Sequence, residues 1–300
     1  MPLSILKEPE FLGIVIGLLF GIIAKIMLLR TDYRQYPTYP HGKVIHMSLG
    51  VIAAGLGALV VPALLSKEYT AVTFLTLAAQ QFRDVRRMER ETLTEIDDLE
   101  LVPRGNAYIE GIAMVFEGRN YLVIFSALIA SLFTVLFVWY WGVVAGILSL
   151  LVAKMFQKGK SIEHIADVHI ADVKIEDPDL FVESIYIMNV GLREDIEIIK
   201  ENGVGLVLTP KNDNSKVTLS GLGQRQALLH NLSTLLGVYR DSGEPTLIPM
   251  AKLDLESGKL AIFILPREKD PQKILRAVKG APIVENSVRM PTEAYKGGKA

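Results

Sequence analysis

The chain contains no cysteine. Disulfide bonds, thiolate nucleophiles, cysteine-ligated iron–sulfur clusters and cysteine zinc sites are therefore excluded. An excess of charge of either sign is also absent, since 32 basic and 33 acidic residues leave a net charge of -1 over 300 residues. Without a basic field to attract phosphate groups, we predict no nucleic-acid partner.

What the chain has in abundance is apolar sequence, which makes up 50% of its residues and is gathered into long runs. An α-helix needs about 20 apolar residues to cross the hydrocarbon core of a bilayer. No small-residue cleavage site follows the first run, so we predict a retained span rather than a signal peptide. We predict about five spans in contact with lipid, as three helices within 1–82 and a helical hairpin within 120–157. The runs cover residues 11–29, 44–65, 69–82 and 121–156, and the last can turn at an interfacial Trp139-Tyr140-Trp141.

The short run 69–82 decides the topology. The positive-inside rule places clusters of basic residues on the cytoplasmic side. If 69–82 crosses, all three clusters lie on one side, with the N-terminus outside and the C-terminal domain in the cytoplasm. With four spans, the C-terminal domain would share the side of the N-terminus. The clusters are Arg30, Arg34 and Lys43; Arg83, Arg86, Arg87 and Arg90; and Lys154, Lys158 and Lys160.

Two features of the first run concern its neighbours. Gly13, Gly17 and Gly21 recur at every fourth residue and leave one smooth helix face, which favours close packing of helices. Lys25 lies near the far end of the run, and we expect its long side chain to extend toward the interface at Arg30.

A charged juxtamembrane segment, 83–119, separates the first three helices from the hairpin. A carboxylate at the edge of a membrane is costly to desolvate, which marks it as a functional candidate. Glu110 and Glu117 are seven residues apart and share a helix face, so either can pair with an arginine or, with a raised pKa, act as an acid or base. The catalytic candidates are Glu110, Glu117, Asp97 and Asp98, and the candidates for substrate or partner contact are Arg83, Arg86, Arg87, Arg90 and Tyr108.

The region 161–290 alternates strand and helix patterns, and 291–300 has the composition of a flexible tail. The expected strands are 184–190, 203–209, 246–254, 259–265 and 282–289, and the expected helices are 192–202, 215–236 and 270–278. We predict a soluble α/β (α+β) domain with a mixed, ferredoxin-like sheet, of ordinary domain size.

The soluble region carries no complete cofactor or metal motif, so we predict none. Gly221-Leu-Gly223 lacks both the Walker lysine and the third Rossmann glycine. The five-residue repeat places His164 and His169 apart on a helix and on opposite faces of a strand, which argues against a metal site. Asp241-Ser242-Gly243 has the residue types of an aspartic protease triplet, but a single copy would need a homo-oligomer, and a surface turn is the simpler interpretation.

The segment Tyr108-Ile109-Glu110-Gly111-Ile112-Ala113 is identical to the signature of the YIEGIA family, multi-spanning proteins of endospore-forming Firmicutes. The arginine-rich helix before it and the segment 221–230 are also similar, so the resemblance covers most of the chain. It implies a role in sporulation or spore properties, in the cell or forespore membrane. It also implies a membrane-embedded protease or a component that controls proteolysis, without assigning catalytic residues.

Two functions from different classes follow from these observations. The first is a carboxylate-type membrane protease acting on a protein substrate, with Glu110 as the leading candidate residue because it belongs to the signature. The second is a non-enzymatic membrane scaffold whose cytoplasmic domain binds a protein partner. Transport is disfavoured because no Asp, Glu, Lys, Arg or His occurs from Asn120 to Ala153.

Overall fold

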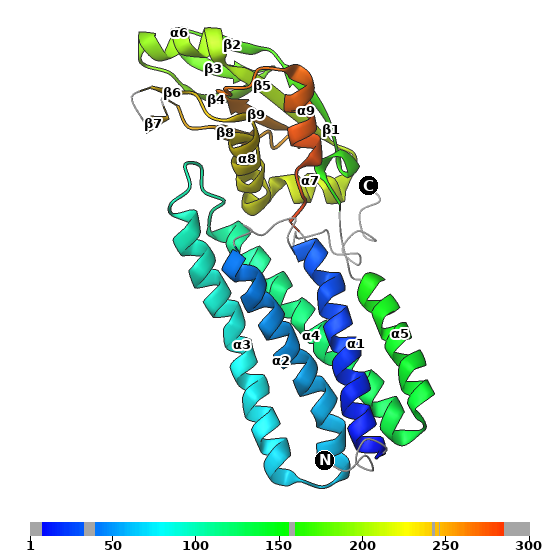
Figure 1. The fold of residues 1–300 in the computed structure, drawn as a ribbon. Coiled ribbons are helices and arrows are strands. Elements are labelled where there is room, and N and C mark those ends of the chain that lie inside the picture. The colour runs from blue at the N-terminus through cyan, green and yellow to red at the C-terminus, as the bar shows by residue number, and fades with distance from the viewer. Residues whose placement is uncertain (1–7, 33–39, 156–159, 242–243, 246, 285–300) are drawn as a thin grey trace. The chain divides into compact units, whose positions relative to one another are not determined.

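The computed structural model describes residues 8–32, 40–155, 160–241, 244–245 and 247–284 (Figure 1). The chain divides into two compact units, each described by itself. The first, the helical unit, is Met1–Glu91 with Ile112–Gly159, and the second, the soluble unit, is Thr92–Gly111 with Lys160–Ala300. The loop between two long helices therefore belongs to the soluble unit.

Long helices supply the whole of the helical unit. Within the described residues, three of them are long and apolar enough to cross a membrane: Pro9–Arg30, Gly42–Leu65 and Asn106–Leu136. Trp139–Met155 is apolar but shorter, and the third helix along the chain is apolar only in its first half. The helices are α1 (Pro9–Asp32), α2 (Pro40–Leu65), α3 (Tyr69–Asp97), α4 (Asn106–Leu136) and α5 (Trp139–Met155).

Small residues bring these helices into close contact. Gly17 lies so near α4 that a Cβ atom there would stand 2.7 Å from the Ala127 carbonyl oxygen. A Cβ atom on Gly21 would meet Ala54 of α2 at 2.5 Å, and one on Gly13 would overlap Val135. All three glycines of the predicted smooth face therefore lie against neighbouring helices, where only a hydrogen atom fits.

The charged segment 83–119 is not a separate element in the structure. Residues 83–97 continue α3 from its apolar half without a break, and residues 106–119 are the first half of α4. The sequence around residue 82 has neither proline nor glycine, which would interrupt a helix. The side chains change there from apolar to charged, but the helical backbone continues.

The soluble unit is built on a four-stranded antiparallel sheet in the order β1-β5-β9-β8. A second antiparallel sheet, in the order β2-β3-β4, covers part of one face. The main-sheet strands are β1 (Ala166–Ala171), β5 (Val204–Pro210), β8 (Met250–Leu253) and β9 (Leu260–Ile264). The others are β2 (Val173–Glu176), β3 (Asp179–Val182), β4 (Ile185–Asn189) and the short pair β6 (Arg240–Asp241) and β7 (Glu244–Pro245). The helices are α6 (Arg193–Asn202), α7 (Asp213–Ser220), α8 (Leu222–Leu236) and α9 (Pro271–Gly280), with the 3₁₀ turn η2 (Ile162–His164).

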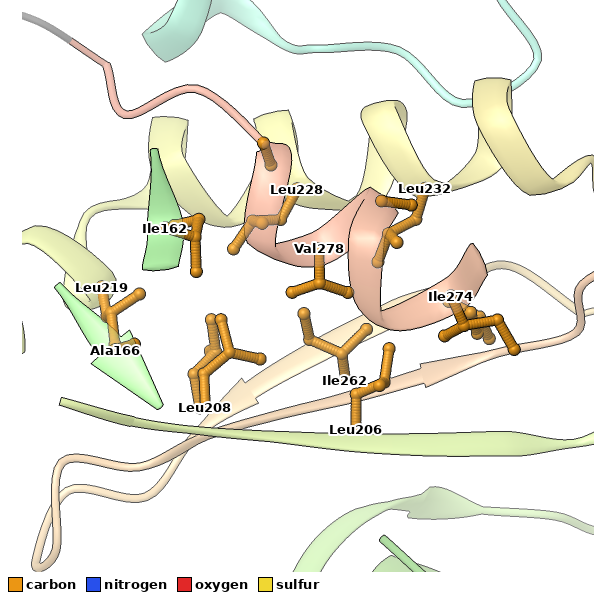
Figure 2. Close-up of a cluster of buried hydrophobic side chains, with 14 of the residues drawn as sticks. Ile162, Ala166, Leu206, Leu208, Leu219, Leu228, Leu232, Ile262, Ile274 and Val278 are labelled. Carbon is orange, nitrogen blue, oxygen red and sulfur yellow. The ribbon is translucent and has the colours of Figure 1, made fainter. Parts of the chain in front are cut away.

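Alternate residues of the central strands enter two different cores. Leu206, Leu208 and Ile262 point toward the helical layer, where Figure 2 shows them facing Leu228 of α8 and Val278 of α9. Val207, Ala261 and Phe263 point to the other face and pack with the second sheet and α6. Strand β9 is buried along its whole length, which explains its unbroken apolar sequence.

Three predictions for this unit are corrected. The mixed sheet is wrong, because every paired strand among the described residues is antiparallel. The strand order β1-β5-β9-β8 also differs from a ferredoxin-like sheet, since the first two strands of the main sheet are direct neighbours. The expected helix 215–236 is two helices that meet at Gly221. In place of a strand over 282–289, residues 282–284 form only an isolated bridge between Pro282 and Ser161, whereas 285–289 and the tail 291–300 lie outside the described residues.

Candidate functional site: a buried polar centre in the helical unit

Four helices of the helical unit each place one polar side chain in a shared interior. We call this group the polar centre, and it consists of Lys25 on α1, His46 on α2, Glu89 on α3 and Asn120 on α4. Lys25 and Asn120 have no exposed surface, His46 is 1% exposed and Glu89 is 7% exposed. Ionisable groups at such a place are costly, and they are retained mainly where they have a function.

The Lys25 ammonium group is held by two residues of α4. Its Nζ donates a hydrogen bond of 2.8 Å to Oδ1 of Asn120, and it stands 4.4 Å from the centre of the Phe116 ring. The aliphatic stem passes over Gly50 of α2, where a Cβ atom would overlap it. The expectation that Lys25 extends toward Arg30 is therefore wrong, because Gly50 leaves room for the stem and Asn120 and Phe116 bind the charge.

His46 and Glu89 form the second half of the polar centre. Nε2 of His46 lies 3.5 Å from Oε1 of Glu89, and the imidazole ring is 4.6 Å from the centre of Phe116. The same aromatic ring therefore contacts both the ammonium group and the imidazole. A carboxylate held beside an imidazole is a side-chain arrangement that can accept a proton from a bound group, with the imidazole fixing the orientation of the carboxylate.

Two members of the polar centre lie near the ends of their candidate spans, whereas Asn120 lies near the middle of Asn106–Leu136. Lys25 stands five residues before the end of the Pro9–Arg30 span, and His46 stands four residues after the start of Gly42–Leu65. With about 3.6 residues per turn, both positions are little more than one turn from the boundary.

One hydrogen-bond donor of the polar centre is unused. Asn120 accepts from Lys25 through Oδ1, which orients its amide group, and its Nδ2 atom is buried without a hydrogen-bond partner among the residues that the structure describes. Buried donors are nearly always paired in native proteins, so an unused one invites a ligand. Its place beside a fixed ammonium group suits a carbonyl oxygen or an oxyanion.

The predicted catalytic carboxylates have different surroundings. Oε2 of Glu117 lies 3.7 Å from Nη1 of Arg86, and its Oε1 accepts a hydrogen bond of 3.3 Å from the Tyr121 hydroxyl. Asp98 is exposed, and Glu110 is half-buried on α4. Glu117 therefore links α3 to α4 one residue beyond Phe116, while the catalytic role of all these residues stays a prediction.

Asp97 is buried and organises the turn that leads into α4. Its two carboxylate oxygens accept hydrogen bonds from the backbone N–H groups of Arg104, at 2.7 Å, and Gly105, at 2.8 Å. The Arg104 guanidinium lies 3.6 Å from the same carboxylate and 3.7 Å from Glu100. Both oxygens are thus occupied by the chain's own donors, which is the arrangement of a structural turn.

Replacing Asp97 by alanine should destabilise this turn, whereas Asp98→Ala provides a matched control. Loss of the buried acceptor leaves two donors unpaired and should cost about 2–3 kcal/mol. The exposed neighbour should change stability by less than about 0.5 kcal/mol. Hydrogen exchange of the amides of 99–106 in the purified full chain measures both, and equal protection in the two variants would contradict the structural role.

The residues predicted to contact a substrate or partner also differ in their surroundings. Arg87 is exposed and pairs with Glu91 at 3.9 Å, Arg90 is exposed, and Tyr108 is buried. Arg83 lies on α3, and its side chain is outside the described part of the molecule. Sequence reasoning missed the polar centre, although a lone lysine inside an otherwise uncharged apolar run was a visible signal.

Comparison with known proteins finds a matching family and a similar protein, but no matching solved structure. The family model described as YIEGIA protein matches residues 13–294. The chain is 53% identical over 284 residues to "Uncharacterized protein YphB" of Bacillus subtilis (strain 168), covering 94% of this chain and 95% of that protein. No solved structure matches the chain.

Proposed function

The chain belongs to the YIEGIA family, and we propose that it is a membrane-embedded, carboxylate-type protease whose site is the polar centre. Glu89 takes the part of the general base, in place of the juxtamembrane Glu110. The observation that carries the proposal is the juxtaposition of a buried Glu89–His46 pair with a Lys25–Asn120 pair around one aromatic ring. The resemblance to proteins of endospore formers extends the proposal to a role in sporulation, and the Bacillus subtilis relative supports the family membership on which this extension rests.

The reaction follows from the chemistry of these side chains. Glu89 takes a proton from a water molecule, and the hydroxide oxygen forms a bond to the carbonyl carbon of a peptide group. The Lys25 ammonium and Nδ2 of Asn120 donate to the oxyanion that develops. The C–N bond then breaks as Glu89 returns the proton to the leaving nitrogen, which yields a carboxyl group and an amine. His46 positions the carboxylate throughout.

We extend the proposal to the membrane topology. Five helices cross, with the N-terminus outside and the soluble unit in the cytoplasm. The support is that basic residues stand at the ends of two candidate spans, at Arg30 and Lys43, and in the last turn of the shorter apolar helix α5, at Lys154. The apolar halves of α3 and α5 are short, so each would need its polar or aromatic flanks to complete the crossing.

The test compares protein N-termini in four kinds of cells. One lacks the chain, and the others express the unaltered chain, Glu89→Gln, or Glu91→Gln at equal membrane levels. Glu91 is a matched control because it lies on the same helix but is exposed, with a side chain 61% accessible. We expect a set of cleavages with the unaltered chain and Glu91→Gln that is absent with Glu89→Gln.

Two outcomes would count against the proposal. If Glu89→Gln produced the same cleavages, proteolysis would be real but Glu89 would not be its base. If the unaltered chain produced none, the non-enzymatic scaffold would replace the protease, and the partner of the soluble unit would be the next question.

A further inference from the structure

Helix α8 presents one face to the segment that joins α3 to α4. Gly223, Gln226 and His230 follow one another at spacings of three and four residues, so they form a single stripe along the helix. The segment is Val102–Ala107, and it belongs to the same compact unit as α8. We call the stripe and this segment together the α8 latch.

Contacts run along the whole α8 latch in antiparallel order. At one end, a Cβ atom on Gly223 would stand 3.2 Å from the backbone of Ala107 and Tyr108, so glycine permits this approach. In the middle, Gly105 has a φ of +80° and lies against the side-chain amide of Gln226. Both positions depend on glycine, one for space and one for its backbone conformation.

At the other end, His230 joins α8 to the segment by a hydrogen bond. Its Nδ1 atom is 2.7 Å from the carbonyl oxygen of Val102, so the ring donates a hydrogen bond there. The Thr234 hydroxyl lies 3.4 Å from Nε2 on the other side of the ring. His230 is 8% exposed, which places a titratable group inside a contact that two separate parts of the chain share.

Burial lowers the pKa of His230, and the hydrogen bond to Val102 opposes this effect. Arg104, which lies in the segment, lowers the pKa further, whereas Asp97 at the end of α3 and Glu100 just after it raise the pKa. A lowered pKa means that the neutral ring favours the closed contact. The stability that His230 contributes is therefore complete above its ordinary pKa of about 6.5 and is lost as the pH falls below that value.

We propose that the α8 latch is a pH-sensitive device. It holds the segment Val102–Ala107 against helix α8 at neutral pH and releases the segment on acidification. It does not depend on the proteolytic activity proposed above. Because the segment is the connection between α3 and α4, release frees the ends of two helices that also carry Glu89 and Asn120.

Hydrogen exchange of the full chain in lipid nanodiscs tests this device. Rates corrected for the intrinsic pH dependence of exchange should show residues 99–107 and 223–230 protected at pH 7.5 and less protected at pH 5.5, by up to about tenfold, because one histidine with an ordinary pKa of about 6.5 can change the opening equilibrium by no more than that over this range. His230→Gln keeps a side-chain donor but cannot titrate, so its protection should not change over this range. His169→Gln is the matched control, because its side chain is 52% exposed, and it should respond like the unaltered chain.

A second variant guards against the failure of His230→Gln to fold, which lost protection of β5 and β9 would reveal. Glu100→Gln leaves the core untouched and removes a charge that raises the pKa of His230 in the closed contact. The pKa difference between the closed and the open form then becomes larger, so the opening midpoint should move to higher pH. The proposal is overturned if the unaltered chain does not open between pH 7.5 and 5.5, if a folded His230→Gln still opens, or if the midpoint of Glu100→Gln stays where it was.

Discussion

Replacing Asn120 by leucine should lower the thermal midpoint of the purified protein by roughly 6–12 °C, which corresponds to about 3 kcal/mol. The leucine has a similar volume but cannot accept the hydrogen bond from Nζ of Lys25. An ammonium group without exposed surface then loses a partner that water cannot replace.

The double variant Lys25→Met with Asn120→Leu should recover most of that stability. Removing both members of a buried polar pair is often nearly neutral, whereas removing one is not. The same double variant should lose proteolysis by about a hundredfold or more, because both proposed oxyanion donors are gone. Recovery of stability without recovery of activity would separate the structural from the chemical role of the pair.

Ser126→Ala is the matched control for this series. Ser126 lies on α4 like Asn120, is 1% exposed, and its hydroxyl has no hydrogen-bond partner among the described residues. Its replacement should be neutral or slightly stabilising. The interpretation fails if Asn120→Leu is as stable as Ser126→Ala, or if the double variant is no more stable than Asn120→Leu alone.

Gly57→Ala should destabilise the helical unit, whereas Gly55→Ala, two residues earlier on α2, should not. A Cβ atom on Gly57 would overlap the carbonyl oxygen of Ile124 and stand 2.9 Å from Cβ of Ala127. A backbone oxygen inside a helix cannot move alone, so α2 and α4 must separate, at a cost of about 2–3 kcal/mol.

Nothing lies within 4 Å of the corresponding Cβ position on Gly55. There the change to alanine should gain up to about 1 kcal/mol through helix propensity. Thermal midpoints of the two purified variants should therefore differ in sign relative to the unaltered chain. Equal midpoints would mean that α2 and α4 do not approach as closely as the structure has them.

The local pattern of the sequence was sufficient for most of the elements. The apolar runs 11–29 and 44–65 coincide with α1 and α2, since hydropathy over about 20 residues depends on composition alone. In the soluble unit, α9 lies where a helix was expected over 270–278, and the carboxylate of its cap, Asp270, accepts a hydrogen bond from the backbone of Gln272 at 2.9 Å. Caps and spans are short-range properties, so they can be read without knowledge of the fold.

The local sequence pattern did not predict which strands pair with each other. Short apolar runs identify β5 and β9 as strands, yet 50 or more residues separate them, and neither periodicity nor composition specifies that they lie side by side and antiparallel. The incorrect mixed sheet has this origin. The same holds for the α8 latch, whose hydrogen bond joins residues 128 positions apart.

By itself, the sequence indicated that long apolar helices are followed by a separate α/β region. It also excluded cysteine chemistry and contained the family signature around Glu110. Each of these conclusions depends on composition or on a short segment. Only the tertiary structure brought Lys25 to Asn120 and His46 to Glu89, pairs whose members are 95 and 43 residues apart. The physical reason is that a buried charge is tolerated only where separate helices supply its partners, and the helices meet through small residues whose contacts no single segment encodes.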